Sequence, residues 1–118
     1  MKALGKHLIV ELYGCDYKLI SDVDYIQETM MICAKEANTT IIDSVFHKFN
    51  PYGVSGVIVV AESHLSIHTW PEHKFASVDF FTCGDHSDPW KSFKIIKKKL
   101  KSKHFSVIKM QRGVLLDE

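Results

Sequence analysis

The pattern of apolar and polar residues predicts a strand and then a helix in the first third of the chain. Residues 7–13 place leucine or valine at every second position, as a half-buried strand does. Residues 22–37 carry apolar side chains at helical spacing and therefore predict one amphipathic helix. Ser21 is the expected N-cap of this helix, and Asn38 is its expected end.

Four further strands are predicted in the middle of the chain, as two hairpins. The first hairpin joins residues 40–49 to residues 54–61, and the Asn50-Pro51-Tyr52-Gly53 segment between them has the composition of a turn. The second hairpin joins residues 64–70 to residues 75–83.

A second helix is expected to begin at Asp88-Pro89, where a capping residue precedes a proline at the first helical position. Its expected inner face consists of Trp90, Phe93, Ile96 and Leu100. Residues 104–111 complete the series as a last strand. This order predicts an α+β fold, with an antiparallel sheet and two helices on one of its faces. The other face also needs a cover, and a second protomer is the simplest one.

Composition narrows the class of protein. The chain has 118 residues, 46% of them hydrophobic and 25% charged, which suits one globular domain. A net charge of +1 argues against a nucleic-acid binder, and no apolar run is long enough to span a bilayer. We expect no signal peptide, because Glu11 interrupts the first apolar run. The three cysteines are odd in number and far apart, which is typical of a cytoplasmic protein without disulfides.

Two features that could suggest other functions have simpler explanations. His64 and His68 are four residues apart on a predicted strand, too far to share a metal ion without a bend, so we expect no metal site. The lysines between residues 97 and 103 lie near the predicted C-terminal end of a helix. Their interaction with the helix dipole accounts for them without a nucleic-acid partner.

The segment of residues 61–72 allows two interpretations. In the first, polar residues that alternate with Leu65 and Ile67 form an ordinary half-buried strand. In the second, the Ser63 hydroxyl attacks the carbonyl of Glu62 and forms an ester. A base then removes the serine α-proton, elimination leaves dehydroalanine, and hydrolysis converts it into a pyruvoyl group. That group can form a Schiff base with an amine and act as an electron sink.

Strand geometry tests where an acid and a base for this chemistry could lie. If residues 70 and 75 pair across the second hairpin, Cys83 lies opposite Glu62, beside Ser63, and it has a proton to give. The alternative for Cys83 is a small buried apolar residue. His68 is expected to face away from Ser63, roughly 16 Å along the strand at about 3.3 Å per residue. Either the chain bends sharply or the histidine comes from another subunit.

These residues resemble the prokaryotic S-adenosylmethionine decarboxylases, which are pyruvoyl enzymes of spermidine synthesis. The match runs along nearly the whole chain and includes these motifs: His7-Leu8, Phe46-His47, Pro51-Tyr52-Gly53-Val54-Ser55-Gly56, Glu62-Ser63-His64-Leu65, Ile67-His68-Thr69-Trp70-Pro71-Glu72, Phe81-Thr82-Cys83-Gly84 and Asp88-Pro89-Trp90. The resemblance implies that the single domain of residues 1–118 cuts itself between Glu62 and Ser63. A β chain of 1–62 and an α chain of 63–118 would result.

The resemblance also implies roles for individual residues in cleavage. Ser63 becomes the pyruvoyl group and the Schiff-base carbonyl, and Glu62 contributes the cleavage site. His68 is the proton acceptor in processing, and Ser55 matches the processing serine of the family.

For turnover of S-adenosylmethionine, Cys83 matches the proton donor. Phe49 matches an aromatic residue that stacks on adenine, Glu72 a carboxylate that binds the ribose hydroxyls, and Leu65 is also assigned to substrate binding. The implied assembly is a homodimer of αβ units, two α and two β chains in an αββα sandwich. Each active site would be shared, with residues 62, 63 and 83 from one protomer and residues 49, 55, 68 and 72 from the other.

Two alternatives remain open at this point. Some relatives with this fold decarboxylate arginine or ornithine, and only the nucleoside contacts favour S-adenosylmethionine. A partner that binds nucleosides or regulates an active paralogue, without catalysis, is the third possibility. The intact set of Ser63, His68 and Cys83 argues against it.

Overall fold

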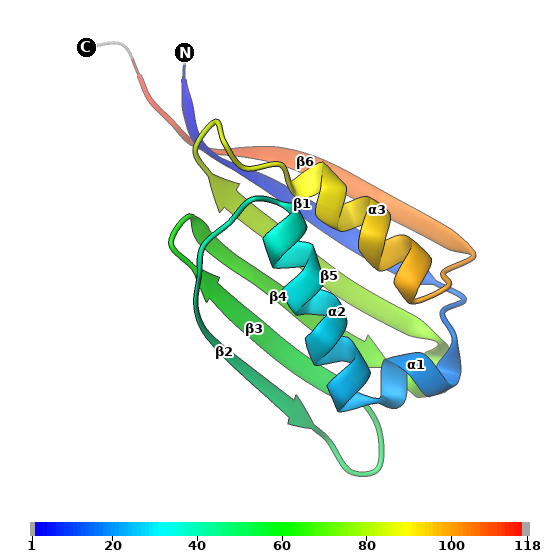
Figure 1. Ribbon diagram of the computed structural model, residues 1–118. Helices are drawn as coiled ribbons and strands as arrows, with labels where there is room; N and C mark the ends of the chain where they lie inside the picture. The colour runs from blue at the N-terminus through cyan, green and yellow to red at the C-terminus, as the bar shows by residue number, and fades with distance from the viewer. Residues whose placement is uncertain (1, 117–118) are drawn as a thin grey trace.

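The strands predicted from alternation form one six-stranded antiparallel sheet in the computed structural model, which describes residues 2–116 (Figure 1). The sheet order is β2-β3-β4-β5-β1-β6. The elements in chain order are β1 (Ala3–Tyr13), α1 (Tyr17–Ser21), α2 (Val23–Glu36), β2 (Ile41–Lys48), β3 (Val54–Val60), β4 (Ser63–Trp70), the 3-10 turn η1 (Pro71–His73), β5 (Phe75–Cys83), α3 (Pro89–Lys99) and β6 (His104–Val114). The predicted α+β class and the order of strands and main helices are confirmed; α1 and η1 were not predicted.

The predicted N-cap of the first main helix is wrong by one residue. Ser21 closes the short helix α1, where its hydroxyl donates to the Tyr17 carbonyl at 2.7 Å. Asp22 is extended and caps α2, since its carboxylate accepts from the backbone N–H groups of Asp24 and Tyr25 at 3.0 and 3.1 Å. Aspartate and serine are both favoured at the N-cap. Because Ser21 is the last residue of α1, Asp22 becomes the cap of α2.

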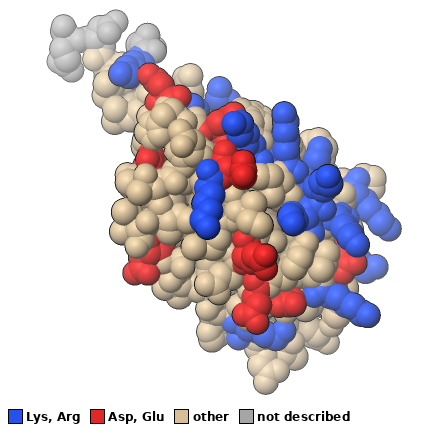
Figure 2. Space-filling model, in the orientation of Figure 1, with Lys and Arg blue, Asp and Glu red and all other residues tan. Residues whose placement is uncertain are grey.

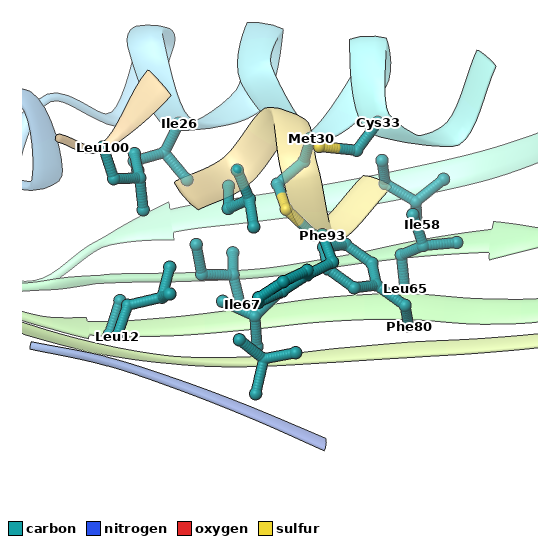
Figure 3. Packing of buried hydrophobic residues seen from close by; sticks show 14 of the residues in the cluster. Leu12, Ile26, Met30, Cys33, Ile58, Leu65, Ile67, Phe80, Phe93 and Leu100 are labelled. Atoms are coloured by element: carbon teal, nitrogen blue, oxygen red, sulfur yellow. The ribbon is translucent and has the colours of Figure 1, made fainter. Parts of the chain in front are cut away.

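Both main helices, α2 and α3, cover the same face of the sheet (Figure 1). The core lies between these helices and that face. Figure 3 shows how Met30 and Cys33 of α2 meet Phe93 of α3 above Phe80 of β5. The inner face of α3 is as predicted for three of its four positions. Trp90 is the exception: it is 37% exposed and lies edge-on against the Phe93 ring at 5.9 Å.

The predicted register of the second hairpin is confirmed. Trp70 pairs with Phe75, and the same pairing continues to His64 and Phe81. Beyond that pair, Ser63 and Thr82 are the next positions along the two strands. The register therefore brings Cys83, the last residue of β5, to the beginning of β4.

The face of the sheet away from the helices, called the open face below, carries exposed apolar side chains. Its residues alternate with the core residues along β4 and β5, and Val45 of β2 and Ile108 of β6 are 64% and 60% exposed. Val57, Val59 and Met110 are exposed on the same face. Exposed apolar residues that gather on one face, and are not scattered singly, are typical of an interaction surface.

The helix side is strongly charged. Figure 2 shows basic side chains gathered over α3. Lys97, Lys98 and Lys99 lie in the last turn of this helix. The Lys97 ammonium lies 5.3 Å from the Phe93 ring and 4.8 Å from the Phe105 ring, so this side chain also covers apolar surface. Among residues 2–116, no helix is long and apolar enough to cross a membrane.

Candidate functional site

The predicted cleavage site lies in a tight hairpin between β3 and β4. Val60 pairs with Ser63, so only Ala61 and Glu62 connect the two strands. The Ala61 N–H donates to the Thr40 carbonyl at 2.8 Å, which fixes the turn against the start of β2. Ser63 has a φ of 144°, a value that non-glycine residues rarely adopt and that costs on the order of 1–3 kcal/mol. The strain is therefore stored at the residue that carries the attacking hydroxyl.

The Ser63 hydroxyl lies against Cys83. Its Oγ is 3.0 Å from the Cys83 Sγ, and both residues are partly buried. In a regular strand Ser63 would share the helix-side face with Leu65; the backbone at Ser63 departs from regular strand geometry, and its hydroxyl meets Cys83 instead.

Cys83 differs from the other two cysteines in its surroundings. Cys15 and Cys33 are buried in the core, and burial raises the pKa of their thiols to about 11 and about 12. A buried thiol of that kind neither ionises readily nor reaches a ligand. Cys83 is the cysteine that contacts Ser63, so it does not have the surroundings of an ordinary buried apolar residue.

Thr82 carries a buried hydroxyl that has no hydrogen-bond partner within residues 2–116. Its side chain is completely buried, and the next position across the hairpin is Ser63. The Ser63 hydroxyl, which could have paired with it across the strands, contacts Cys83 instead. The orphaned hydroxyl beside residue 63 was not predicted from the sequence.

Both carboxylate oxygens of Glu62 are bound. Oε1 accepts from the Thr40 backbone N–H at 2.9 Å, and Oε2 lies 2.9 Å from Nε2 of His86. These contacts, first the backbone N–H and then the imidazole, lower the pKa of Glu62 below its usual value. His86 and Thr40 were missed by sequence reasoning, because nothing in the local pattern brings a loop histidine to this turn.

A second cluster surrounds His68 on the open face. Ser55 and His68 pair across β3 and β4, and Ser55 Oγ is hydrogen-bonded to His68 Nδ1. The Trp70 ring lies 4.5 Å from the His68 ring, and the Phe49 ring 6.0 Å from it. The sequence predicted Ser55, His68 and Phe49 for one site, and they lie together here.

A shallow hollow at this cluster is lined by residues of β2, β3, β4 and β5, and Asp79 of β5 lies at its side and joins a polar network that extends to β1 and β6. Ser66 donates to Asp79 at 3.2 Å, and His7 Nε2 lies 2.9 Å from the other oxygen of Asp79. Arg112 in turn reaches Nδ1 of His7 at 2.9 Å. This network was not predicted, since its members are far apart in the sequence.

The structure does not bring the two clusters together within one chain. β4 runs without interruption from Ser63 to Trp70 and is paired with β3 and β5, so no sharp bend carries His68 toward Ser63. The five residue steps from Ser63 to His68 span roughly 16 Å at about 3.3 Å per residue. Of the two explanations for the distance, the bend is excluded.

Two predicted substrate contacts differ in their accessibility. Glu72 is exposed in η1, two residues after Trp70 and thus at the His68 end of β4. Leu65 is completely buried in the core on the helix side of the sheet. Its side chain is therefore unavailable to a ligand, because alternation along β4 directs it into the core. Only the backbone of Leu65 is left for a substrate contact, and its assignment to substrate binding stays a prediction.

The comparisons with known proteins agree with one another. Residues 6–113 match the model of the S-adenosylmethionine decarboxylase family. The S-adenosylmethionine decarboxylase proenzymes of Fervidobacterium nodosum and Thermotoga maritima are 53% and 51% identical over 113 residues. These matches cover 96% of this chain and 82% and 87% of the relatives. The crystal structure of the adenosylmethionine decarboxylase from Aquifex aeolicus superposes with a TM-score of 0.93 at 41% identity, over 100% of this chain and 98% of that one.

Within residues 2–116, no group of three or more histidine, cysteine, aspartate or glutamate side chains is arranged to hold a metal ion.

Proposed function

The chain belongs to the S-adenosylmethionine decarboxylase family, and on that premise we propose that it cuts itself between Glu62 and Ser63 and then releases carbon dioxide from S-adenosylmethionine. One observation carries the proposal. Ser63 has a strained backbone at the exact junction of two strands, and its hydroxyl contacts a thiol that can later serve as an acid.

Self-cleavage uses groups that the chain itself supplies. The Ser63 Oγ forms a bond to the Glu62 carbonyl carbon, and the C–N bond breaks, which leaves an ester and a free amine. A base removes the Ser63 α-proton and the Cβ–O bond breaks. The main-chain carboxylate of Glu62 departs as the new C-terminus of the first fragment. The remaining enamine takes up water and releases ammonia, so that the second fragment begins with a pyruvoyl group.

The residues around position 63 fit a pyruvoyl group. Its carbonyl would bind the substrate amine and accept the electrons released when carbon dioxide leaves. The Thr82 hydroxyl, which has no hydrogen-bond partner within residues 2–116, lies at the next position across the hairpin. Buried polar atoms are usually hydrogen-bonded, so a group formed at residue 63 is a candidate partner for it. Cys83 would deliver a proton from Sγ to the former α-carbon of the substrate, as a general acid 3.0 Å from the residue that forms the group.

We propose that two copies of the chain pack their open faces together and share each site. His68 lies toward one end of β4, with Ser55 of β3 beside it, and Ser63 lies at the other end, so antiparallel packing of two such faces would bring the ends together. The exposed apolar residues of β2, β3 and β6 support the same face as the interface. His68 of one copy would then act as the base for Ser63 of the other.

The substrate side of the site would also come from the His68 cluster. Phe49 is 42% exposed and its ring is free to stack on adenine, and the sulfonium of the substrate favours an aromatic wall. Glu72 is exposed nearby and would accept hydrogen bonds from the ribose hydroxyls. The alternative substrates arginine and ornithine are not supported, because the matching family model and relatives carry the name of S-adenosylmethionine decarboxylase.

The intact mass of freshly purified protein tests the proposal. We expect two fragments, residues 1–62 and residues 63–118, with a ketone in place of the amine on the second. Release of carbon dioxide from S-adenosylmethionine, but not from arginine or ornithine, should accompany them. A chain that stays whole, or one that is cut but releases no carbon dioxide, would contradict the proposal and favour a non-catalytic binding protein.

A further inference from the structure

Glu62 is held from both sides of the bond that follows it. Thr40, whose N–H binds Oε1, belongs to the segment before the cleavage site, and His86, which binds Oε2, belongs to the segment after it. The carboxylate is only 12% exposed, whereas the His86 ring is 52% exposed. The side chain next to the reacting carbonyl is therefore fixed at its far end, although it lies in a surface turn.

The loop that carries His86 is built to hold the ring in this place. Gly84 has a φ of 87°, and a Cβ at this position would come within 2.6 Å of the His86 ring. Only glycine meets both conditions without strain. The Asn38 side chain donates to the His86 carbonyl at 3.0 Å, and the Asp88 N–H donates to the Ala37 carbonyl at 2.9 Å. The loop is thus anchored to the end of α2.

We propose that His86 is a positioning residue for self-cleavage, and that its Nε2–H holds the Glu62 side chain so that the Glu62 carbonyl faces the Ser63 hydroxyl. This inference rests on the proposed function. His86 acts through Glu62 and does not touch the reacting atoms. The Thr40 backbone N–H holds the other oxygen of the same carboxylate, and a side-chain substitution at Thr40 leaves this N–H in place.

Two physical effects give the contact its value. Attack on a carbonyl requires a narrow range of orientations, and a fixed neighbouring side chain limits rotation of the residue that carries that carbonyl. The attack also develops negative charge on the Glu62 carbonyl oxygen, close to the negative charge of the same residue's carboxylate. The hydrogen-bond donors to both carboxylate oxygens partly neutralise the carboxylate charge, and its repulsion of the charge that develops on the carbonyl oxygen becomes weaker.

After cleavage the same contact would join the two fragments. Glu62 would be the last residue of the first fragment, and His86 lies in the second. Because the contact between Glu62 and His86 fixes the end of the first fragment and does not involve the thiol of Cys83, we expect it to affect maturation and not turnover.

The rate of fragment formation in fresh, uncut protein tests the inference. We expect His86→Ala to slow first-order cleavage about 10- to 100-fold, the scale on which misoriented groups lose rate. His86→Gln, whose amide nitrogen can donate to the same oxygen, should recover most of the rate. Asp85→Ala is the matched control, since Asp85 is exposed in the same loop and its side chain makes no hydrogen bond within residues 2–116. It should mature at the native rate.

Two further measurements separate positioning from a general loss of structure. The matured fraction of His86→Ala should release carbon dioxide at the native rate per pyruvoyl group and should still unfold in one cooperative transition. In the Glu62→Ala background, adding His86→Ala should slow cleavage no further, because the two residues act through one contact. Native cleavage in His86→Ala, or equal losses in the alanine and glutamine variants, would overturn the inference. Failure of the native chain to cut itself would instead refute the proposed function.

Discussion

Ser63→Ala and His68→Ala should complement each other when both variants are present in one cell. Each variant alone lacks either the nucleophile or the base and should remain uncut. In a mixed dimer with shared sites, the Ser63 of the His68→Ala chain faces the native His68 of the Ser63→Ala chain. One complete site is restored, and the second site lacks both residues. If each site were formed within one chain, no mixture could contain a complete site.

The size of the effect follows from symmetry. With equal amounts and random pairing, about half of the dimers are mixed, and each has one working site, so about one quarter of all chains become cut. Every cut chain carries the His68→Ala substitution. The separation of roughly 16 Å along β4 predicts no cleavage within one chain, because proton transfer requires about 2.6–3.2 Å between heavy atoms.

The assay is co-expression with two different affinity tags, followed by tandem purification and intact-mass measurement. Mixed dimers isolated in this way should have about half of their chains cut, all from the His68→Ala variant. Homodimers of each variant, purified in parallel, are the control. Isolated mixed dimers whose chains all remain intact would refute the shared site.

Four further predictions concern single residues. Cys83→Ala should still cut itself but release carbon dioxide about 10²–10⁴-fold more slowly, and normal turnover would rule out its role as proton donor. Iodoacetamide at mild alkaline pH should label Cys83 in the folded protein and spare Cys15 and Cys33, whose pKa values burial raises to about 11 and about 12; peptide mass mapping would show equal labelling if this is wrong. In an uncleavable background, Thr82→Val should raise the melting temperature by about 4 °C, because it removes a buried hydroxyl that has no partner within residues 2–116 and costs about 1 kcal/mol, and calorimetry that finds a decrease would contradict this. Glu62 has a lowered pKa in the native state, so its ionised form contributes stability above its ordinary pKa, and this contribution is lost as pH falls through the native pKa; Glu62→Gln in an uncleavable background should flatten that loss in denaturant titrations, and an unchanged acid profile would contradict the assignment.

The register of the central hairpin could be predicted because it depends on local rules. A turn of fixed length between Trp70 and Phe75, together with alternation on both strands, leaves one pairing that keeps the apolar residues on one face. The neighbourhood of Ser63 and Cys83 follows from that pairing alone. The distance between Ser63 and His68 was predictable for the same reason, since it needs only the rise of a strand.

Features that depend on loops and on single backbone angles were not predictable in this way. No pattern in the sequence indicates the φ of 144° at Ser63, or that the Thr82 hydroxyl has no hydrogen-bond partner within residues 2–116. The contact between Glu62 and His86 joins residues 24 positions apart through a loop whose course no repeat or alternation specifies. The short helix α1 was missed because five residues are too few to display a helical period.

Scission between β3 and β4 would leave two fragments whose strands are interleaved in one sheet. The first fragment would keep β1, β2 and β3, yet β1 lies between β5 and β6 of the second. The pieces could part only by breaking three ladders of hydrogen bonds at once, those between β3 and β4, β1 and β5, and β1 and β6. Once melted, however, they would diffuse away from each other, so the return to the native state would become second order in protein. Dilution would then lower the midpoint of heat denaturation beyond what dissociation of the dimer alone accounts for.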